Sequence, residues 1–323
     1  MAIDAEKRPI GRNFGDETES DVPVAPDRIK PEHSSMPPAS RLLTFGPRAL
    51  ANERSILIDG NSVAFIRAGG QGAAVLLIHG NSACKEVFEH QISFLAECGL
   101  DVIAADLPGH GASDNASEPR ETYSFPGYGR VLRRLMSGLG IDQYHVVGWS
   151  LGGHIGLEMW FEDEAVRSLT ITGTPPVRLS PIGASEGFLP STVMDLAGKE
   201  NFSRADVSAY GSAMLGESID PDSWFGRRVA RTDGTARSLM LQNGLAGLGH
   251  DEESAVALCP KPLAILQGRN DPFVNLSHLE RLAYGNLWLN SPVMIDGGHA
   301  PHWTHPSEFN RCLVNFIAES DGP

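Results

Sequence analysis

The stretch DQYHVVGWSLGGHIGLEMW, residues 142–160, decides the fold predicted for this chain. It opens with a short apolar run, Tyr144–Val147, whose β-branched residues predict a buried strand. It closes with the apolar residues of Ile155–Trp160, which fit the start of a mostly buried helix. Between them, Gly148–Gly152 reads GWSLG and matches G-x-S-x-G, the pattern of a nucleophile elbow at a strand-to-helix turn.

Such a turn makes physical demands that these five residues meet. A serine enters so tight a turn only when the residues two before and two after it lack clashing side chains, and both are glycines here. The turn lifts the hydroxyl clear of the sheet and aims the free N–H groups of the helix N-terminus at a developing oxyanion. We therefore predict that Ser150 is a catalytic nucleophile. The alternative is a glycine-rich turn that happens to contain a serine.

Composition excludes several classes of protein. The chain has 323 residues, of which 41% are hydrophobic, enough for a large core. Its formal net charge is -14 and it has no run rich in Lys or Arg, which argues against a nucleic-acid or anionic-membrane partner. No stretch reaches the roughly 18 apolar residues of a membrane helix. The first residues also lack the apolar segment of a secretory signal.

The cysteines indicate a reducing compartment. They are widely spaced, form no CxxC pair, and predict reduced thiols in a cytoplasmic protein, with neither a disulfide framework nor a structural zinc site. They are Cys84, Cys98, Cys259 and Cys312.

The chain divides into three parts. Residues 1–50 are rich in proline and show no clean period, so we predict an extended or poorly ordered arm. Residues 51–173 and 259–323 alternate strand and helix, which predicts an α/β fold with a mostly parallel, doubly wound sheet. Residues 174–258 are apolar and helical, and we predict a cap over the active site. The predicted strands are 55–59, 62–67, 73–78, 102–105, 144–147, 166–171, 262–266 and 292–295, and the predicted core helices are 87–98, 128–139 and 307–318.

Three loops follow predicted strands, at the sheet edge where a parallel sheet collects its catalytic groups. Asn81, in the first loop, is placed to give an oxyanion N–H beside that of Leu151. Asp271 lies in a glycine-led turn, before a proline that suits the start of a helix, and its alternative role is a helix cap. His299 lies in a glycine loop after the last strand. The order Ser150, Asp271, His299 is the chain order of a serine triad on such a sheet.

Other histidines offer weaker alternatives. His79 could act as a base, but a buried imidazole that anchors its loop is the stronger prediction. His299, His302 and His305 recur at every third position, a spacing that raises a metal site as an alternative. Prolines at 301 and 306 interrupt any helix there, so these side chains need not share a face. No HExxH-type cluster occurs, and we expect no metal and no cofactor.

With these residues in view, the chain from about Arg54 to Ala318 resembles the α/β-hydrolase superfamily. The loop DLPGHG at 106–111, after the second parallel strand, is also typical of that superfamily. A narrower resemblance, to the serine-type (AidH-like) N-acyl-homoserine-lactone lactonases, rests on several runs together. These runs are HGNS at 79, GWSLGGHIGLEM at 148, ITGTPPV at 171, ARTDG at 230, GNLW at 285 and GHAP at 298.

The narrower resemblance implies metal-independent opening of the lactone ring of N-acyl homoserine lactones, the activity known as quorum quenching. It also implies that Tyr210, in the run DVSAYG, meets the substrate from the cap. We place Gly80 and Ser82, on either side of Asn81, against the substrate as well. Those enzymes can carry Glu as the triad acid, where this chain has Asp271.

The expected partner is therefore a small acyl lactone or ester, and the sequence does not fix the oligomeric state. In the predicted mechanism Asp271 orients His299, and His299 takes the proton of Ser150 as the hydroxyl attacks the carbonyl. Direct activation of water by His299 stays open. A general carboxylesterase, or an acylase that cuts the amide, is the alternative on the same fold, and a non-enzymatic ligand receptor is a third.

Overall fold

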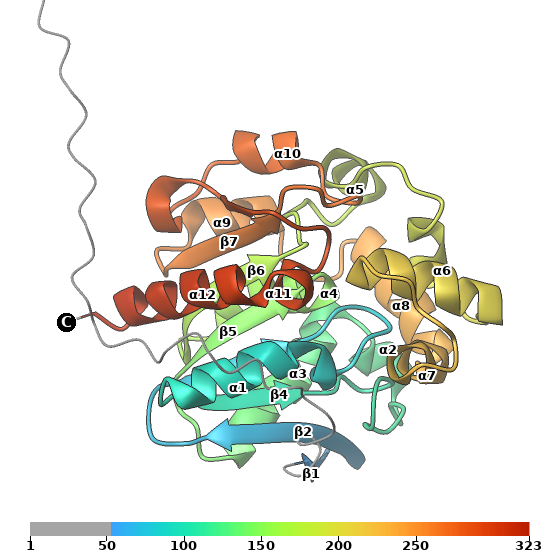
Figure 1. The fold of residues 1–323 in the computed structure, drawn as a ribbon, viewed down its shortest axis with the longest axis horizontal. Helices are drawn as coiled ribbons and strands as arrows, with labels where there is room; N and C mark the ends of the chain where they lie inside the picture. Colours follow the sequence, from blue (N-terminus) through green and yellow to red (C-terminus); the bar gives the residue numbers. More distant parts are fainter. Residues whose placement is uncertain (1–52, 323) are drawn as a thin grey trace, which may run out of the picture. The chain divides into compact units, whose positions relative to one another are not determined.

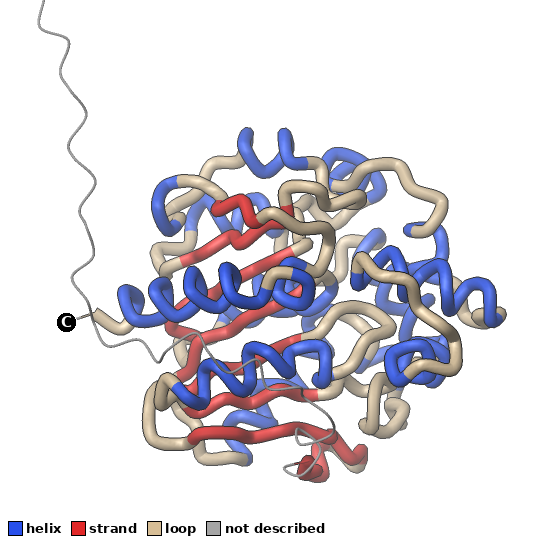
Figure 2. The backbone as a smooth tube through the Cα atoms, viewed as in Figure 1, coloured by secondary structure: helices blue, strands red, loops and turns tan. Residues whose placement is uncertain are grey.

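The computed structural model describes residues 53–322, so the predicted arm at 1–50 lies outside the described residues. Within them, an eight-stranded sheet has the order β1-β2-β4-β3-β5-β6-β7-β8 (Figures 1 and 2). β2 runs antiparallel to both β1 and β4, whereas the other neighbours pair in parallel. The strands are β1 (Glu53–Ile58), β2 (Asn61–Gly69), β3 (Ala74–Ile78), β4 (Asp101–Ala105), β5 (Tyr144–Trp149), β6 (Val166–Thr172), β7 (Leu263–Gly268) and β8 (Val293–Ile295).

Helices cover both faces of this sheet, as a doubly wound arrangement requires. α1 and α12 lie on one face, and α3 and α4 lie on the other, with α9 packed against α4 (Figure 1). The elements outside residues 174–258 are η2 (Lys85–Phe88), α1 (Glu89–Glu97), α2 (Pro119–Thr122), α3 (Phe125–Gly138), α4 (Leu151–Glu162), α10 (Leu276–Arg281), η4 (Trp288–Asn290), α11 (Pro301–Thr304) and α12 (Pro306–Ser320). The predicted fold class is confirmed.

The continuous apolar run of β3 explains why the sheet is buried on both sides. Val75 and Leu77 join the hydrophobic cluster under α1 and α12. Leu76 and Ile78 join the cluster under α3 and α4. All four side chains are fully buried. Successive residues of a strand point to opposite faces, so a strand covered on both faces must be apolar at every position.

Residues 174–258, called the cap segment below, contain helices and no named strand. Figure 1 shows α6, α7 and α8 grouped beyond the carboxyl ends of the parallel strands. The elements of the cap segment are α5 (Pro181–Gly187), η3 (Met194–Gly198), α6 (Arg204–Leu215), α7 (Trp224–Arg231), α8 (Gly234–Leu245) and α9 (Glu252–Leu258).

Two helices begin three or more residues away from their predicted starts. α3 begins at Phe125, three residues before the predicted start, because the Ser124 side chain caps it by accepting the N–H of Gly127. The helix expected from Pro272 is wrong: α10 begins only at Leu276. No helix among residues 53–322 is long and apolar enough to cross a membrane.

Candidate active site

Ser150 lies where β5 ends and α4 begins, with φ 54° and ψ −120°. Non-glycine residues rarely adopt a positive φ, so this backbone is strained. The turn is fixed from both sides. The Ser150 N–H donates to the carbonyl of Thr172 at 2.9 Å, and the Ser150 carbonyl accepts the N–H of Gly153 at 2.8 Å and the hydroxyl of Thr174 at 2.9 Å. These bonds hold the serine in the geometry of a nucleophile elbow.

The glycines on either side of Ser150 are required by close backbone contacts. A Cβ atom on Gly148 would lie 2.2 Å from the carbonyl oxygen of Gly152. A Cβ atom on Gly152 would lie 2.0 Å from the carbonyl oxygen of Ile78 in β3. Both contacts are with backbone, which cannot move aside as a flexible side chain can. The sequence argument for glycine two before and two after the serine therefore has a direct structural basis.

Asp271 and His299 form a buried pair beside this turn. The Nδ1 atom of His299 lies 2.9 Å from Oδ2 of Asp271, and both side chains are almost fully buried. The same carboxylate oxygen accepts the side-chain amide of Gln267 at 2.8 Å. The other oxygen accepts the N–H groups of Phe273 at 2.9 Å and Val274 at 3.2 Å. These two bonds close a turn where a helix was expected.

The surroundings of Asp271 favour its charged form. Burial alone would raise the pKa of this carboxyl, but the neighbouring His299 ring and the hydrogen bonds from His299, Phe273 and Gln267 bring the pKa below its ordinary value. A carboxylate on Nδ1 fixes the tautomer, because it accepts the Nδ1 proton and leaves Nε2 with the lone pair in the neutral ring.

The Nε2 atom of His299 is the one free nitrogen of this pair. It is buried and has no hydrogen-bond partner among the described residues. The His299 ring packs over Gly173, since a Cβ atom on Gly173 would lie 2.8 Å from the ring. Gly173 directly follows Thr172, whose carbonyl holds Ser150. Trp149 donates its indole N–H to the His299 carbonyl at 2.9 Å. The imidazole is thus held next to the serine turn with a free lone pair.

The first predicted oxyanion loop lies against the serine. A Cβ atom on Gly80 would meet Cβ of Ser150 at 3.2 Å. The side-chain amide of Asn81 donates to the carbonyl of Ala197 in the cap segment at 2.9 Å. The backbone N–H of Asn81 has no hydrogen-bond partner among residues 53–322. Leu151 is the first residue of α4, so its N–H has no partner within the helix. Two backbone donors are therefore available near Ser150.

Ser82 and His79 support this loop from beneath. Ser82 is fully buried, donates to the Asn81 side-chain oxygen at 3.3 Å and accepts from Arg237 at 3.3 Å. His79 accepts the N–H of Leu107 on Nε2 at 3.0 Å, so its Nδ1 carries the proton given to the Gly80 carbonyl at 2.8 Å. Burial lowers the pKa of His79, as expected of a structural imidazole.

Ser150 opens into a cavity of about 400 Å³ between the core and the cap segment. Its walls are mainly apolar, with a few polar groups, an arrangement typical of small-molecule sites. Asn81, Leu151 and Tyr210 line it, whereas Gly80 and Ser82, which were also placed against the substrate, are not among its lining residues. Apolar side chains from the cap segment that line it include Val177, Leu179, Phe188, Met194, Met214, Met240 and Leu241.

Tyr210 reaches this cavity from α6 and is 2% exposed. Its ring meets Phe202 edge-on with ring centroids 5.5 Å apart. Burial raises the pKa of the Tyr210 hydroxyl above its ordinary value, against the opposing effects of Arg237 and the Asn81 side chain. The hydroxyl is therefore protonated at neutral pH and can donate a hydrogen bond into the cavity.

The three histidines raised as a metal alternative have different surroundings. His302 is fully buried against Phe88 and Trp149, and burial lowers its pKa to about 3. His305 is exposed and its Nδ1 lies 3.0 Å from the Thr304 hydroxyl. With His299 on Asp271, the three do not form a metal-binding group among the described residues.

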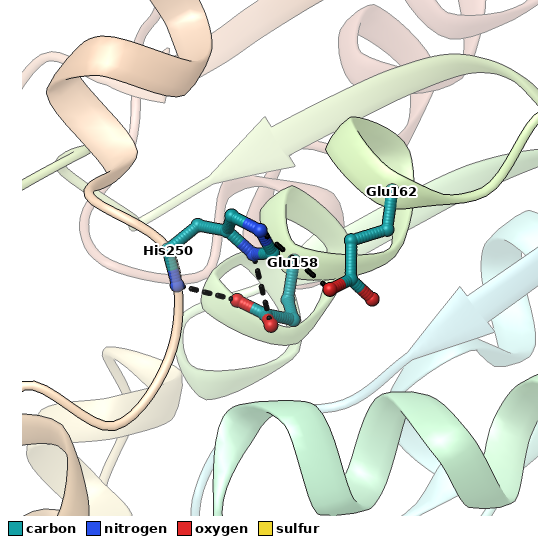
Figure 3. Close-up of side chains that lie close together, drawn as sticks. All are labelled: Glu158, Glu162 and His250. Atoms are coloured by element: carbon teal, nitrogen blue, oxygen red, sulfur yellow. Dashed lines mark hydrogen bonds and ion pairs between the residues drawn. The ribbon is translucent and has the colours of Figure 1, made fainter.

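One group among residues 53–322 does bring enough donor atoms together to hold an ion: Glu158, Glu162 and His250 (Figure 3). His250 lies 3.0 Å from Glu158 through Nδ1 and 3.5 Å from Glu162 through Nε2. Glu158 also accepts the backbone N–H of His250 at 2.9 Å, and Glu162 pairs with Arg133 at 3.1 Å. Contacts within the protein already engage these three side chains, so we assign no function to them.

Sequence reasoning missed several residues of the site. Gln267 bridges Asp271 and the N–H of Gly173, which it binds at 3.1 Å. A polar residue that ends the apolar run of β7 was the signal for it. A second buried histidine–carboxylate pair, His154 with Glu252, also borders the cavity. The spacing of His154, one helical turn after Ser150, could have indicated it, whereas nothing in the sequence near Glu252 did.

Comparisons with known proteins agree on the architecture. The sequence profile of the α/β hydrolase fold matches residues 73–306. The solved structure of the N-acyl homoserine lactonase AidH complexed with N-butanoyl homoserine is 38% identical to this chain. It superposes with a TM-score of 0.80 and covers 84% of this chain and 98% of that chain.

Curated relatives share less sequence and carry other names. A 2-hydroxy-6-oxononadienedioate/2-hydroxy-6-oxononatrienedioate hydrolase of Pseudomonas sp is 26% identical over 266 residues, 78% of this chain and 90% of that protein. The dihydrolipoyllysine-residue acetyltransferase component of the acetoin cleaving system of Cupriavidus necator is 28% identical over 268 residues, 80% of this chain and 67% of that protein. The names of these relatives indicate different substrates, so the comparisons agree more closely on the fold than on the substrate.

Proposed function

Because the chain belongs to the α/β-hydrolase family and is a hydrolase acting on ester bonds, we propose that it opens the lactone ring of N-acyl homoserine lactones. The observation that carries the proposal is the likeness to AidH, at 38% identity over nearly the whole of that chain. The cavity supports it. An apolar space with a few polar groups near Ser150 suits a substrate with a polar head and an apolar chain.

We propose that Ser150, His299 and Asp271 form the catalytic triad. Nε2 of His299 takes the proton of the Ser150 hydroxyl as its oxygen bonds to the lactone carbonyl carbon. The carboxylate of Asp271 stabilises the imidazolium that forms and stays ionised, in keeping with its lowered pKa. When the ring C–O bond breaks, the imidazolium returns the proton to the departing alkoxide. A water molecule then releases the N-acyl homoserine, with His299 as its base.

The developing negative charge needs donors that are already in place. We assign this role to the backbone N–H groups of Asn81 and Leu151, which lie near Ser150 without competing partners. A donor of this kind contributes on the order of 3 kcal/mol to the transition state. Because the cavity lies under the cap segment, we propose that residues 174–258 are a cap that keeps bulk water from the acyl chain.

Incubation of the purified chain with N-hexanoyl homoserine lactone and mass analysis of the product tests the proposal. Ring opening adds one water and gives N-hexanoyl homoserine. An acylase would give hexanoic acid and free homoserine lactone instead. Hydrolysis of simple aryl esters with the lactone left intact would indicate a general carboxylesterase. Binding of the lactone without any product would indicate a ligand receptor.

A further inference from the structure

A second histidine–carboxylate pair borders the cavity, apart from Asp271 and His299. Nδ1 of His154, on α4, lies 2.8 Å and 3.0 Å from the two carboxylate oxygens of Glu252, on α9. Both residues are more than nine-tenths buried. Glu252 also accepts the backbone N–H of Val177 at 3.0 Å. One helix and one loop of the cap segment and one core helix therefore hold this pair, called the His154–Glu252 dyad below.

The ring of His154 is held in one orientation. Phe125 stacks on it almost in parallel, with an interplanar angle of 8° and centroids 5.2 Å apart. Phe188 packs on it at a centroid distance of 6.0 Å. These two phenylalanines line the cavity together with His154 itself. The hydrogen bonds that His154 forms with Glu252 use Nδ1, so Nε2 is the nitrogen left for a ligand in the cavity.

His154 lies on the same side of α4 as the nucleophile. It follows Ser150, the N-cap residue of α4, by four residues, and its backbone N–H donates to the Ser150 carbonyl at 3.4 Å. Ser150, Leu151 and His154 all line the cavity. A substrate whose carbonyl lies at Ser150 therefore passes the dyad within the first few atoms of its acyl part.

The hydrogen-bonding capacity of Nε2 decides what the dyad can bind. Among the described residues, the salt bridges of Glu252 include no Lys or Arg, and its one basic partner is His154. Nδ1 of His154 can donate to this carboxylate in both the neutral and the protonated ring. Nε2 accepts a hydrogen bond in the neutral ring and donates one in the protonated ring, so a hydroxyl group, which is both donor and acceptor, can pair with it in either form.

We propose that the His154–Glu252 dyad determines specificity by binding a hydroxyl group on the acyl chain, close to the amide, as in 3-hydroxy-acyl substrates. The proposal rests on the lactonase function proposed above. An unsubstituted chain leaves Nε2 against methylene groups, whereas a 3-hydroxyl group satisfies it. Sites built to bind a polar group reject the analogue that lacks it. We expect the 3-hydroxy substrate to exceed its unsubstituted counterpart by about ten- to a hundred-fold in kcat/KM.

Two variants and three matched lactones test this proposal. The substrates are N-hexanoyl, N-(3-oxohexanoyl) and N-(3-hydroxyhexanoyl) homoserine lactone. Glu252→Gln removes the charge and keeps an oxygen that accepts the Nδ1 proton, so Nε2 stays oriented and can accept a hydrogen bond. It should keep the preference for the 3-hydroxy chain, whose hydroxyl can donate. The double variant His154→Phe, Glu252→Gln keeps the aromatic stack and should lose this preference.

His250→Gln is the matched control. It alters another histidine–glutamate contact of α4 (Figure 3), whose histidine is not among the cavity-lining residues, and should leave the relative rates on the three lactones unchanged. Thermal melts identify misfolded variants, and the double variant still decides the question when Glu252→Gln is unstable. Equal rates on the 3-hydroxy and the unsubstituted lactone in the parent protein, or an unchanged ratio of these rates in the double variant, would overturn the proposal. A parent protein that opens none of the lactones refutes the lactonase function alone. The dyad is then tested by the same ratio on aryl esters of hexanoic and 3-hydroxyhexanoic acid.

Discussion

Ser150 combines a nucleophilic role with a strained backbone, and two substitutions separate these properties. Ser150→Ala and Ser150→Gly both remove the hydroxyl, so each should lower kcat by about 10⁴- to 10⁶-fold. Alanine keeps the Cβ atom at φ 54°, so the free energy of unfolding should stay near that of the parent. Glycine relieves the strain and should raise it by about 1–2 kcal/mol. Steady-state rates and urea unfolding of the three proteins measure both effects. Near-normal kcat in Ser150→Ala would refute the serine mechanism.

Asp271 should make the free energy of unfolding depend on pH. Its folded pKa lies below the ordinary value of about 3.9, so its contribution to stability is complete above about pH 4 and disappears as the pH falls through the folded pKa. Asp271→Asn removes this contribution. Its free energy of unfolding should therefore fall less steeply than that of the parent between about pH 5 and pH 2. Urea unfolding at several pH values compares the two slopes, and identical slopes would contradict the expectation.

Tyr210 tests recognition without altering the packing. Tyr210→Phe keeps the ring against Phe202 and removes the hydroxyl alone. We expect kcat/KM for an N-acyl homoserine lactone to fall by about 10- to 100-fold, because one hydrogen bond to the polar head is lost. A simple aryl ester lacks that head and should lose much less. Both rates are measured on one preparation, with a thermal melt as control. An equal loss on both substrates, or none on either, would remove Tyr210 from the recognition site.

At the scale of elements, the strand–turn–helix of β5 and α4 depends on backbone contact with β3. Gly152→Ala would place a Cβ atom 2.0 Å from the Ile78 carbonyl oxygen, so the turn must shift. We expect a loss of about 1–3 kcal/mol in the free energy of unfolding, together with most activity. Gly129→Ala in α3 is the control. Its Cβ atom meets a flexible atom of Met159 at 3.1 Å and should cost little. Equal stability of the two variants would show that the turn is not tightly packed.

Sequence predicted the strands well because buried parallel strands are apolar at every position, as in β3 and β5. It misplaced the beginning of α3, since the first turn of that helix is set by the Ser124 cap and not by apolar spacing. It also placed a helix after Asp271, where the carboxylate instead holds the N–H groups of Phe273 and Val274. Local side-chain bonds of this kind compete with helix formation and leave no periodic signal.

At the scale of the whole molecule, the candidate triad was predictable because each member follows a strand of one parallel sheet. Nδ1 of His299 and Oδ2 of Asp271 lie 2.9 Å apart, although 28 residues of chain separate them. The cavity wall was not predictable, because it depends on contacts between distant segments. Glu252 meets His154 across 98 residues, and Asn81 meets Ala197 across 116. No pattern within either segment specifies its partner.

The proposed serine mechanism also makes a prediction for the intact enzyme. The triad uses no metal, so exhaustive dialysis against EDTA should leave kcat/KM for the lactone unchanged. Lactone opening before and after dialysis, with and without added Zn²⁺, is the measurement. Activity lost on chelation and restored by zinc would instead support a metal-dependent hydrolase.

The hydrogen bond from the Asn81 side chain to the Ala197 carbonyl has a kinetic consequence. It ties a proposed oxyanion donor to the cap segment, so an outward movement of η3 either draws Asn81 with it or breaks the bond. Entry of the substrate and stabilisation of the oxyanion are then coupled, because Asn81 returns to its position beside Ser150 only when the cap segment closes. We expect closure over the substrate to complete the oxyanion site as well. A molecule with an open cap segment should therefore not catalyse the reaction.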